Sequence, residues 1–278
     1  MKQSLLIVTN GSPESLPAVE YGLWLAQALP AAVTLLGALD HAQHKPAIDR
    51  AFQVAEERLR ARQPGITRII EPGDPARLAC QTVQAGQHLV ILGPMARPGR
   101  PRGGALRFLL KYIQAPLIYA PQLRQQMKEI LLCTGGLGYI GSAEQWAHYL
   151  AQRTGASLTI LHIVEPTFYD YPVTHQIQVH WEKILQTDTP QGRNLRQAVQ
   201  KAQEAGIPAR VKIRHGDIIH EINAEIHERD YDLVAMGSSA GAHGLRHLYK
   251  PNVTVEIVEK SHLPVLVARL GQEPILES

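Results

Sequence analysis

The stretch LLIVTNGS, residues 5–12, decides the fold because it recurs in altered form as ILLCTGGL at residues 130–137. In each copy an apolar run ends at a threonine and passes into a turn that contains glycine. A short apolar run bounded by such a turn predicts a buried strand that leads into the next element. The recurrence therefore predicts two consecutive copies of one domain.

Four further pairs of segments recur in the same order along the chain. They are 31–39 with 156–164, 73–75 with 216–218, 88–93 with 232–237, and 115–119 with 263–267. Between them the apolar residues switch to helical spacing, as in Ile48, Phe52, Ala55 and Leu59. Strands alternating with amphipathic helices predict parallel sheets with right-handed crossovers and helices on both faces. We therefore expect an α/β fold with two tandem five-stranded, Rossmann-like domains, over residues 1–122 and 128–270.

The length, composition and net charge of the chain agree with two domains and exclude several classes of function. A chain of 278 residues suits two domains, and 45% hydrophobic residues suffice for two cores. The net charge of +3 is too small to indicate nucleic acid as a partner. No apolar stretch reaches the roughly 18 residues of a membrane span, and no signal peptide is recognisable. Cys80 and Cys133 are expected to be buried thiols, which favours a cytoplasmic location.

The second half carries additional residues after its second expected strand. Asn10 and Gly135 are 125 positions apart, whereas Gly73 and Gly216 are 143 apart, a difference of 18. The extra segment falls at about 166–192. It contains a large share of the aromatic side chains, namely Phe168, Tyr169, Tyr171 and Trp181. Long insertions in compact folds are often functional, so the segment is either an extra helix on its own domain or a lid or subunit contact.

These segments resemble the universal stress protein family in its tandem-domain form, over nearly the whole chain. Family domains open with a strand ending in Asp-Gly-Ser, to which Asn10-Gly11-Ser12 corresponds. They also have a Gly-Asp-Pro turn, a fourth strand ending in Met-Gly-Ser and a closing strand Cys-Pro-Val-Leu-Val. The matching segments are Gly73-Asp74-Pro75, Met236-Gly237-Ser238 and Leu263-Pro264-Val265-Leu266-Val267. The resemblance implies domains like the adenine-nucleotide alpha hydrolases, paired about a pseudo-two-fold axis that brings strands 117–119 and 265–267 together.

Family members that bind ATP wrap its phosphates with Gly-x2-Gly-x9-Gly-Ser/Thr after the fourth strand and face the adenosine with an aspartate after the first. Glycines allow backbone N–H groups to approach an anion, and a helix N-terminus adds positive charge. Both halves depart from this pattern. The aspartate is replaced by Asn10 and by Gly135. The loop reads Gly93, Ala96, Gly103-Gly104 in the first half and Gly237, Ala240, Pro251-Asn252 in the second. ATP, another nucleotide or a simpler anion therefore all remain candidate ligands.

The candidate ligand site lies at the carboxyl ends of the strands, where open parallel sheets bind their ligands. In the first half it comprises Asn10, Gly11, Ser12, Ala38, Gly93, Gly103 and Gly104. In the second half it comprises Thr134, Gly135, Ile163, Met236, Gly237, Ser238, Ser239, Ala240, Asn252 and Val253. We expect the second half to be the better anion site. Residues 237–241 offer consecutive backbone N–H donors, whereas Pro94 of the first-half loop has none.

Three arginines, Arg97, Arg100 and Arg102, follow the fourth expected strand of the first half. One interpretation is a solvated charged loop. The other is a phosphate clamp, since guanidinium groups bind phosphate in bidentate fashion. Their place beyond a strand end supports the clamp, because open parallel sheets bind ligands beyond the carboxyl ends of their strands.

Other motifs point to different chemistry. Gly136, Gly138 and Gly141 form a Gly-x-Gly-x-x-Gly, with Glu165 some two dozen residues on, as in dinucleotide-binding folds. The matching junction of the first half has no such motif. His243 and His247 are four apart, but no glutamate follows His243, and we expect solvated histidines and no metal. The sequence contains no P-loop.

Two classes of function follow from these observations. The first is a non-catalytic ligand-sensing or stress-response protein that binds a nucleotide or another anion at the strand ends. The second is a nucleotide-dependent enzyme, either a slow ATP hydrolase or a dinucleotide-binding oxidoreductase. The sequence yields no set of nucleophile, base and orienting group, which favours the first class. The expected partners are a small anionic molecule and, as an option, a second copy of the chain, but neither nucleic acid nor membrane.

Overall fold

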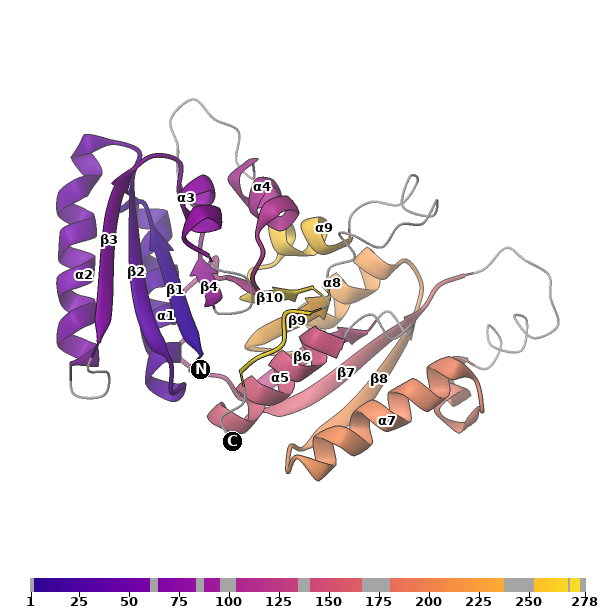
Figure 1. Cartoon of the computed structure of the whole chain (residues 1–278). Helices are drawn as coiled ribbons and strands as arrows, with labels where there is room; N and C mark the ends of the chain where they lie inside the picture. The colour runs from indigo at the N-terminus through magenta and orange to yellow at the C-terminus, as the bar shows by residue number, and fades with distance from the viewer. Residues whose placement is uncertain are drawn as a thin grey trace. The chain divides into compact units, whose positions relative to one another are not determined.

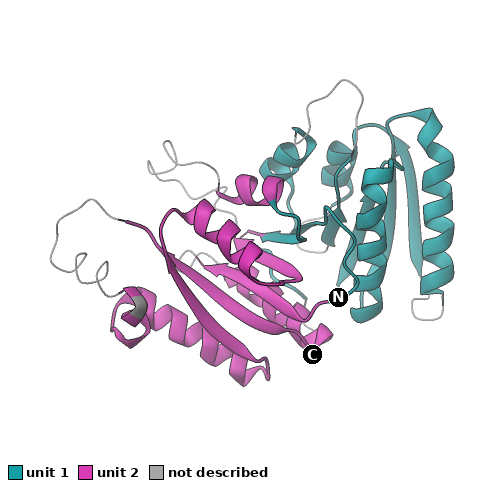
Figure 2. Cartoon of the chain, turned by 180° about the vertical axis from the view of Figure 1, so that it is seen from behind, with its two compact units in different colours: residues 1–126, 261–267, 271–278 teal, residues 127–260, 268–270 magenta. Residues whose placement is uncertain are grey.

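The computed structural model describes residues 3–60, 65–83, 88–95, 104–134, 141–166, 181–237, 253–269 and 271–275. The chain divides into two compact units (Figure 2). Unit 1 consists of residues 1–126, 261–267 and 271–278, and unit 2 consists of residues 127–260 and 268–270. The expected pair of tandem α/β domains is confirmed.

Unit 1 alternates strands and helices in the predicted order. The strands are β1 (Ser4–Thr9), β2 (Ala32–Leu39), β3 (Ile66–Pro72), β4 (His88–Leu92) and β5 (Leu117–Tyr119). The helices are α1 (Leu16–Ala28), α2 (Lys45–Leu59), α3 (Pro75–Thr82) and α4 (Gly104–Tyr112), with short 3-10 turns at Pro13–Ser15 and Ala42–His44. The five strands are parallel in the order β3-β2-β1-β4-β5. Their centre is apolar on both faces, and Leu5 to Val8 are at most 1% exposed, as in a sheet covered by helices.

The last strand of the chain belongs to the sheet of unit 1. β10 (Val265–Ala268) pairs antiparallel with β5, with Leu266 opposite Ile118. The expectation that the two closing strands lie side by side is confirmed. The expected second domain ran on to residue 270, but residues 261–267 group with unit 1 because β10 covers the edge of β5 that would otherwise be unpaired. Beyond it, the backbone N–H of Ile275 donates to Oε1 of Gln3 at 3.1 Å.

Unit 2 repeats the same alternation. Its strands are β6 (Glu129–Thr134), β7 (Ser157–Val164), β8 (Ala209–His215) and β9 (Leu233–Gly237). Its helices are α5 (Gly141–Thr154), α7 (Pro190–Glu204), α8 (Ile218–Glu228) and α9 (Val253–Lys260), with the 3-10 helix η3 (Trp181–Gln186) before α7. The strands are parallel in the order β9-β6-β7-β8. α5 and α7 pack on one face of this sheet, and α8 and α9 lie on the other (Figure 1).

The register of the two central strand pairs is the same in both units. Thr9 at the end of β1 lies beside Gly37 of β2, and Thr134 at the end of β6 lies beside His162 of β7. Side chains alternate between the two faces of a strand, so each pair points to one face. In unit 1 this is the face of α2, because a Cβ on Gly37 would lie 2.5 Å from Cγ2 of Ile48. The two units thus place different residues at equivalent positions near the strand ends.

The Gly-Asp turns have the same structure in both units. Gly73 and Gly216 have φ values of 145° and 151°, a conformation that side chains rarely adopt. The following Asp74 and Asp217 cap α3 and α8, accepting from the backbone N–H of Arg77 at 3.0 Å and of His220 at 2.9 Å. The motif is therefore a turn followed by a helix N-cap.

The segment predicted as an insertion is described only from Trp181 onward, since residues 167–180 lie outside the described ranges. η3 occupies Trp181–Gln186, and Thr189 caps α7 by accepting from the N–H of Gly192 at 3.1 Å. α7 begins at Pro190, so the last residues of the expected insertion, 190–192, form the first turn of this helix.

Cys80 and Cys133 form no disulfide bond. Burial and the neighbouring carboxylate of Glu225 raise the pKa of Cys133 to about 12, so its thiol is held protonated at neutral pH. Over the described ranges, none of the helices combines the length and apolar character needed to cross a membrane.

Candidate ligand site at the strand ends

In unit 1 the hydroxyl of Thr9 is fully used by the turn that follows β1. Ser15 Oγ donates to the carbonyl of Ser12 at 2.8 Å, so the 2.7 Å contact between Thr9 and Ser15 has Thr9 as donor. The same Thr9 oxygen accepts from the backbone N–H of Gly11 at 3.0 Å. Thr9 and Ser15 are both fully buried. This threonine stabilises the turn and has no remaining proton to donate to a ligand.

Asn10, the expected counterpart of the family's aspartate, is also committed to the fold. Its Oδ1 accepts from the N–H of Ser12 at 3.2 Å, and its Nδ2 donates to Oδ2 of Asp40 at 3.0 Å. Asp40 in turn contacts Nδ1 of His44 at 3.3 Å. An aspartate at position 10 would face Asp40 with a like charge, which explains why an amide occupies this position.

Close packing surrounds the other predicted residues of unit 1. A Cβ on Gly11, whose φ is 75°, would lie 2.8 Å from the carbonyl oxygen of His44. A Cβ on Gly93 would lie 2.8 Å from the carbonyl oxygen of Ala120, and Ala38 is fully buried. Gly104 is the first residue of α4. Gly103 and the arginines Arg97, Arg100 and Arg102 lie outside the described residues. The glycines at 11 and 93 thus have a packing role irrespective of any ligand.

Unit 2 leaves the equivalent threonine unsatisfied. Oγ1 of Thr134 is buried and makes no hydrogen bond within the described part of the chain. Gly135, the counterpart of Asn10, lies outside that part. A buried hydroxyl without a partner costs about 1–3 kcal/mol, and native structures rarely leave one unexplained.

A second polar side chain lies directly beside it. His162 is the register partner of Thr134 and is only 6% exposed. Its Nδ1 is buried and has no hydrogen-bond partner among the described residues. Burial lowers the pKa of His162 below its usual 6.5, although a hydrogen bond to the backbone of Thr134 opposes this. The imidazole is therefore neutral at neutral pH.

A third unsatisfied atom lies on the neighbouring strand. His215 ends β8 and is the register partner of Val164, two residues beyond His162 on the same face of β7. Its Nε2 is buried and unpaired within the described ranges, and its ring stacks on Trp181 of η3 at a centroid distance of 6.1 Å. Thr134, His162 and His215 thus lie on one face, near one edge of the sheet.

The remaining predicted residues of unit 2 lie on or beside β9 and β7. Met236 is buried, and the carbonyl of Gly237 accepts from Oγ1 of Thr254 at 3.4 Å. Val253 begins α9, and Ile163 points to the opposite face from His162. Ser238, Ser239, Ala240 and Asn252 lie outside the described residues.

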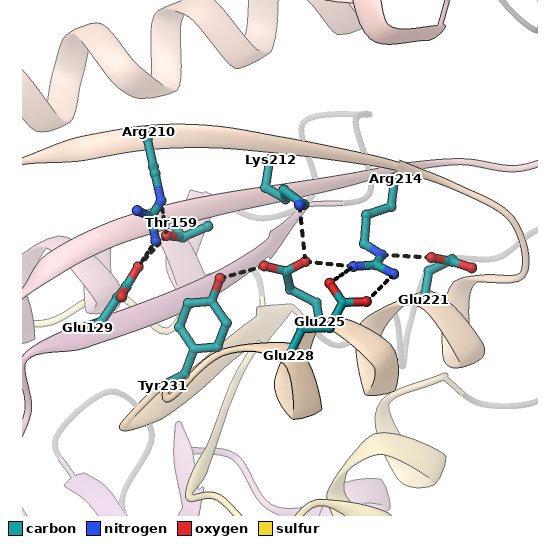
Figure 3. A network of polar contacts seen from close by, with 9 residues as sticks. All are labelled: Glu129, Thr159, Arg210, Lys212, Arg214, Glu221, Glu225, Glu228 and Tyr231. Carbon is teal, nitrogen blue, oxygen red and sulfur yellow. Dashed lines mark hydrogen bonds and ion pairs between the residues drawn. The ribbon is translucent and has the colours of Figure 1, made fainter.

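On the opposite face of the same sheet, ion pairs join β8 to α8 (Figure 3). Arg214 of β8 donates to Glu221 at 2.7 Å, to the buried Glu225 at 2.9 Å and to Glu228 at 2.8 Å. These carboxylates raise the pKa of Arg214 further above its usual range. The hydroxyl of Tyr231 also donates to Glu225, at 2.7 Å. Because these charges satisfy one another, the unsatisfied polar atoms of this edge are those on the face of α5 and α7.

The structure describes little of the dinucleotide-binding motif and of the histidine pair that the sequence offers as alternatives. Gly141 is the first residue of α5, while Gly136, Gly138, His243 and His247 lie outside the described residues. Within the described ranges no three histidine, cysteine, aspartate or glutamate side chains gather as metal ligands. A cleft of about 270 Å³, lined by Gly155 and Gly206 among others, lies at the amino ends of β7 and β8, the far edge from Thr134.

Sequence reasoning missed His162 and His215. The signal for His162 was present in the matched segments 31–39 and 156–164, where a histidine stands opposite Gly37. For His215 there was none, because its role depends on stacking with a residue 34 positions earlier, Trp181.

Comparison with known proteins agrees with this architecture. The model of the universal stress protein family matches residues 127–269. A universal stress protein from Archaeoglobus fulgidus DSM 4304 covers 96% of this chain and 96% of its own, with 16% identity and a TM-score of 0.64. A protein of unknown function from Pseudomonas aeruginosa PAO1 covers 96% of this chain and 92% of its own, with 17% identity and a TM-score of 0.66. No curated protein matches the sequence.

A further solved structure is a universal stress protein in complex with cAMP. It covers 52% of this chain and 98% of its own, with 17% identity and a TM-score of 0.39.

Proposed function

Since this chain belongs to the universal stress protein family, we propose that it is a cytoplasmic ligand-sensing protein that acts by binding and not by catalysis. Its ligand is a nucleotide, such as ATP, or another small anionic molecule. The site is formed by unit 2, at the carboxyl ends of β6, β7 and β9, while the equivalent edge of unit 1 has a structural role.

The contrast between the two equivalent threonines carries this proposal. Thr9 has both a donor and an acceptor for its hydroxyl, whereas Thr134 at the same position has neither among the described residues. Asn10 and Asp40 likewise satisfy each other. A ligand that bonds to Thr134 removes the cost of an unpaired buried hydroxyl at the strand end itself. In unit 1 the strand-end hydroxyl of Thr9 is satisfied, and a buried hydroxyl without a partner among the described residues is that of Ser12, three positions further on.

The phosphate end of such a ligand is assigned to the segment that begins at Gly237. Residues 238–252 lie outside the described residues, so this part of the proposal rests on the sequence, which offers consecutive backbone N–H donors at 237–241, and on the start of α9 at Val253. In unit 1 the corresponding segment begins Gly93-Pro94, and Pro94 contributes no N–H. This asymmetry also supports unit 2 as the ligand-binding unit.

The test is isothermal titration calorimetry of the full chain with ATP, ADP, pyrophosphate and inorganic phosphate. Thr134→Val keeps the side-chain shape and removes the hydroxyl. It should weaken nucleotide binding about 5-fold, the equivalent of one hydrogen bond of about 1 kcal/mol. The variant should be as stable as the parent or slightly more stable, because the lost hydroxyl has no partner among the described residues of the free protein.

Thr9→Val is the matched control. It should lower the free energy of unfolding by about 1–2 kcal/mol, because it leaves the N–H of Gly11 without an acceptor and Ser15 Oγ without a donor. It should leave nucleotide affinity unchanged. If the parent binds none of the four compounds, or if Thr9→Val and not Thr134→Val weakens binding, the assignment to unit 2 is wrong. Release of phosphate from ATP at steady state would contradict a purely binding role.

A further inference from the structure

We propose that unit 1 binds single-stranded nucleic acid on a surface formed by Arg77 of α3 and by Arg107, Phe108, Lys111 and Tyr112 of α4. These five residues are called the α3–α4 surface. The inference goes beyond the proposed function, because it concerns a polymer and a surface made by helices. It does not depend on the ligand site at the strand ends of unit 2.

Basic residues are concentrated in the part of the sequence that forms this surface. Residues 75–128 contain eight arginines and lysines but no aspartate or glutamate. Because the net charge of the whole chain is only +3, the rest of the chain is net acidic. The expectation of no nucleic-acid partner rested on the net charge of the whole chain, which conceals this basic segment. Such a local excess of cations attracts a polyanion.

The fold brings cations from this segment together on two neighbouring helices. α3 and α4 pack side by side (Figure 1), and Arg77, Arg107 and Lys111 are all exposed. Elsewhere in unit 1 an exposed cation pairs with a carboxylate, as Arg58 does with Glu20. Within the described residues no carboxylate forms an ion pair with Arg77 or Lys111. Their charges are therefore available to a partner.

Two aromatic rings hold these cations in place. The guanidinium carbon of Arg77 lies 5.4 Å from the centroid of the Phe108 ring, and Nζ of Lys111 lies 5.0 Å from the centroid of the Tyr112 ring. The two rings contact each other at a centroid distance of 4.7 Å. A guanidinium that lies over a ring keeps the N–H groups at its rim free to bind phosphate oxygens in bidentate fashion.

The exposed ring of Tyr112 indicates which polyanion fits. Tyr112 is 48% exposed, which is unusual for a large ring. Proteins that bind single strands combine cations for the phosphates with aromatic rings on which unpaired bases stack. An acidic polypeptide would use the cations and leave the ring without a role. A membrane would require an apolar face, but Leu106, Leu109 and Leu110 of α4 are at most 6% exposed.

The test is fluorescence polarisation of a labelled oligouridine of about twenty nucleotides, titrated with the full chain from 50 to 200 mM NaCl. At 100 mM NaCl the double variant Arg77→Gln/Lys111→Gln should bind about 10-fold more weakly than the parent. Its plot of log affinity against log salt should be shallower by about 1.4, because each phosphate contact to a single strand contributes about 0.7 to the slope. The matched control is Lys45→Gln/Arg50→Gln on α2, which removes the same charge from exposed positions and should bind like the parent.

Tyr112→Leu tests the role of the ring separately. It should weaken binding of the oligouridine at least 5-fold, which is the low end for the loss of one base–aromatic stack, and leave the salt dependence unchanged. Tyr112 is exposed, so the variant should keep the fold, which circular dichroism checks. A duplex of the same length should bind more weakly than the single strand, because its bases are already stacked.

Several outcomes would overturn the proposal. One is a parent that does not bind the oligouridine at 50 mM NaCl, and another is an equal loss in the α2 control, because binding would then follow total charge alone. If polyglutamate displaces the RNA and Tyr112→Leu binds like the parent, the surface fits an acidic protein. If vesicles of phosphatidylcholine and phosphatidylserine bind and the RNA does not, the surface fits a membrane. In both cases single-stranded nucleic acid is the wrong partner.

Discussion

Arg214→Met should lower the free energy of unfolding of unit 2 by about 3–5 kcal/mol, the usual cost of removing one member of a buried ion pair. Arg214 donates to three carboxylates, and Glu225 among them has a side chain that is only 1% exposed. Methionine fills a similar volume but leaves Glu225 with only the hydroxyl of Tyr231 and the more distant Lys212. An uncompensated buried charge is the physical cause of the loss.

Urea unfolding followed by tryptophan fluorescence measures this effect, because two of the three tryptophans, Trp146 and Trp181, lie in unit 2. Arg210→Met is the matched control on the same strand. Arg210 pairs with Glu129 and Thr159, but its side chain is 45% exposed, so its loss should cost less than about 1 kcal/mol. Equal effects of the two substitutions would show that the network of Figure 3 does not stabilise the fold as described.

Acidification below pH 6.5 should destabilise unit 2. Burial lowers the pKa of His148 and of His162 below the ordinary value of 6.5. Between 6.5 and the lower pKa of the folded state, the unfolded chain binds protons that the folded chain does not. Stability is therefore fully present above pH 6.5 and falls as pH decreases, by up to about 1.4 kcal/mol per pH unit for each such histidine.

Melting temperatures at pH 7.5, 6.5, 6.0 and 5.5 test this linkage. The parent should melt at lower temperature at each step below 6.5, and His162→Phe should show a shallower decrease because one buried histidine is gone. The lowered pKa values of Glu228 and Asp188 act in the same direction, but only near and below their ordinary values of 4.5 and 3.8. A melting temperature that is constant from pH 7.5 to 5.5 would contradict neutral, buried imidazoles.

The architecture could be predicted from the sequence because it depends on local pattern and repetition. The apolar run before Asn10 and its copy before Gly135, together with the capped turns at Asp74 and Asp217, each specify one strand or one helix start. Because the matching segments occur in the same order in both halves, they also predict that strands and helices alternate in the same way in each half. Local pattern could not predict the pairing of β10 with β5, which lies more than 140 residues earlier, and the expectation that these strands lie together came from the family resemblance.

The candidate site could be predicted only in part. The motif placed Asn10 at a strand end, but its pairing with Asp40, 30 residues on, depends on two neighbouring strands ending together. From the sequence, Asn10 looked like a weakened contact to a ligand. In the structure its side chain is hydrogen-bonded to Asp40 within the protein. Likewise, the importance of His162 follows from an unsatisfied nitrogen, which only the folded arrangement reveals.

Hydrogen–deuterium exchange of the full chain, with and without saturating ATP, tests most directly that unit 2 is the ligand-binding unit. The account predicts slower exchange in peptides that cover residues 130–134, 158–166 and 233–237, at the ends of β6, β7 and β9. Peptides that cover 5–12 and 33–40, at the equivalent edge of unit 1, should exchange at the same rate in both samples. Protection confined to the unit 1 peptides would contradict the account, as would exchange that is unchanged throughout the chain.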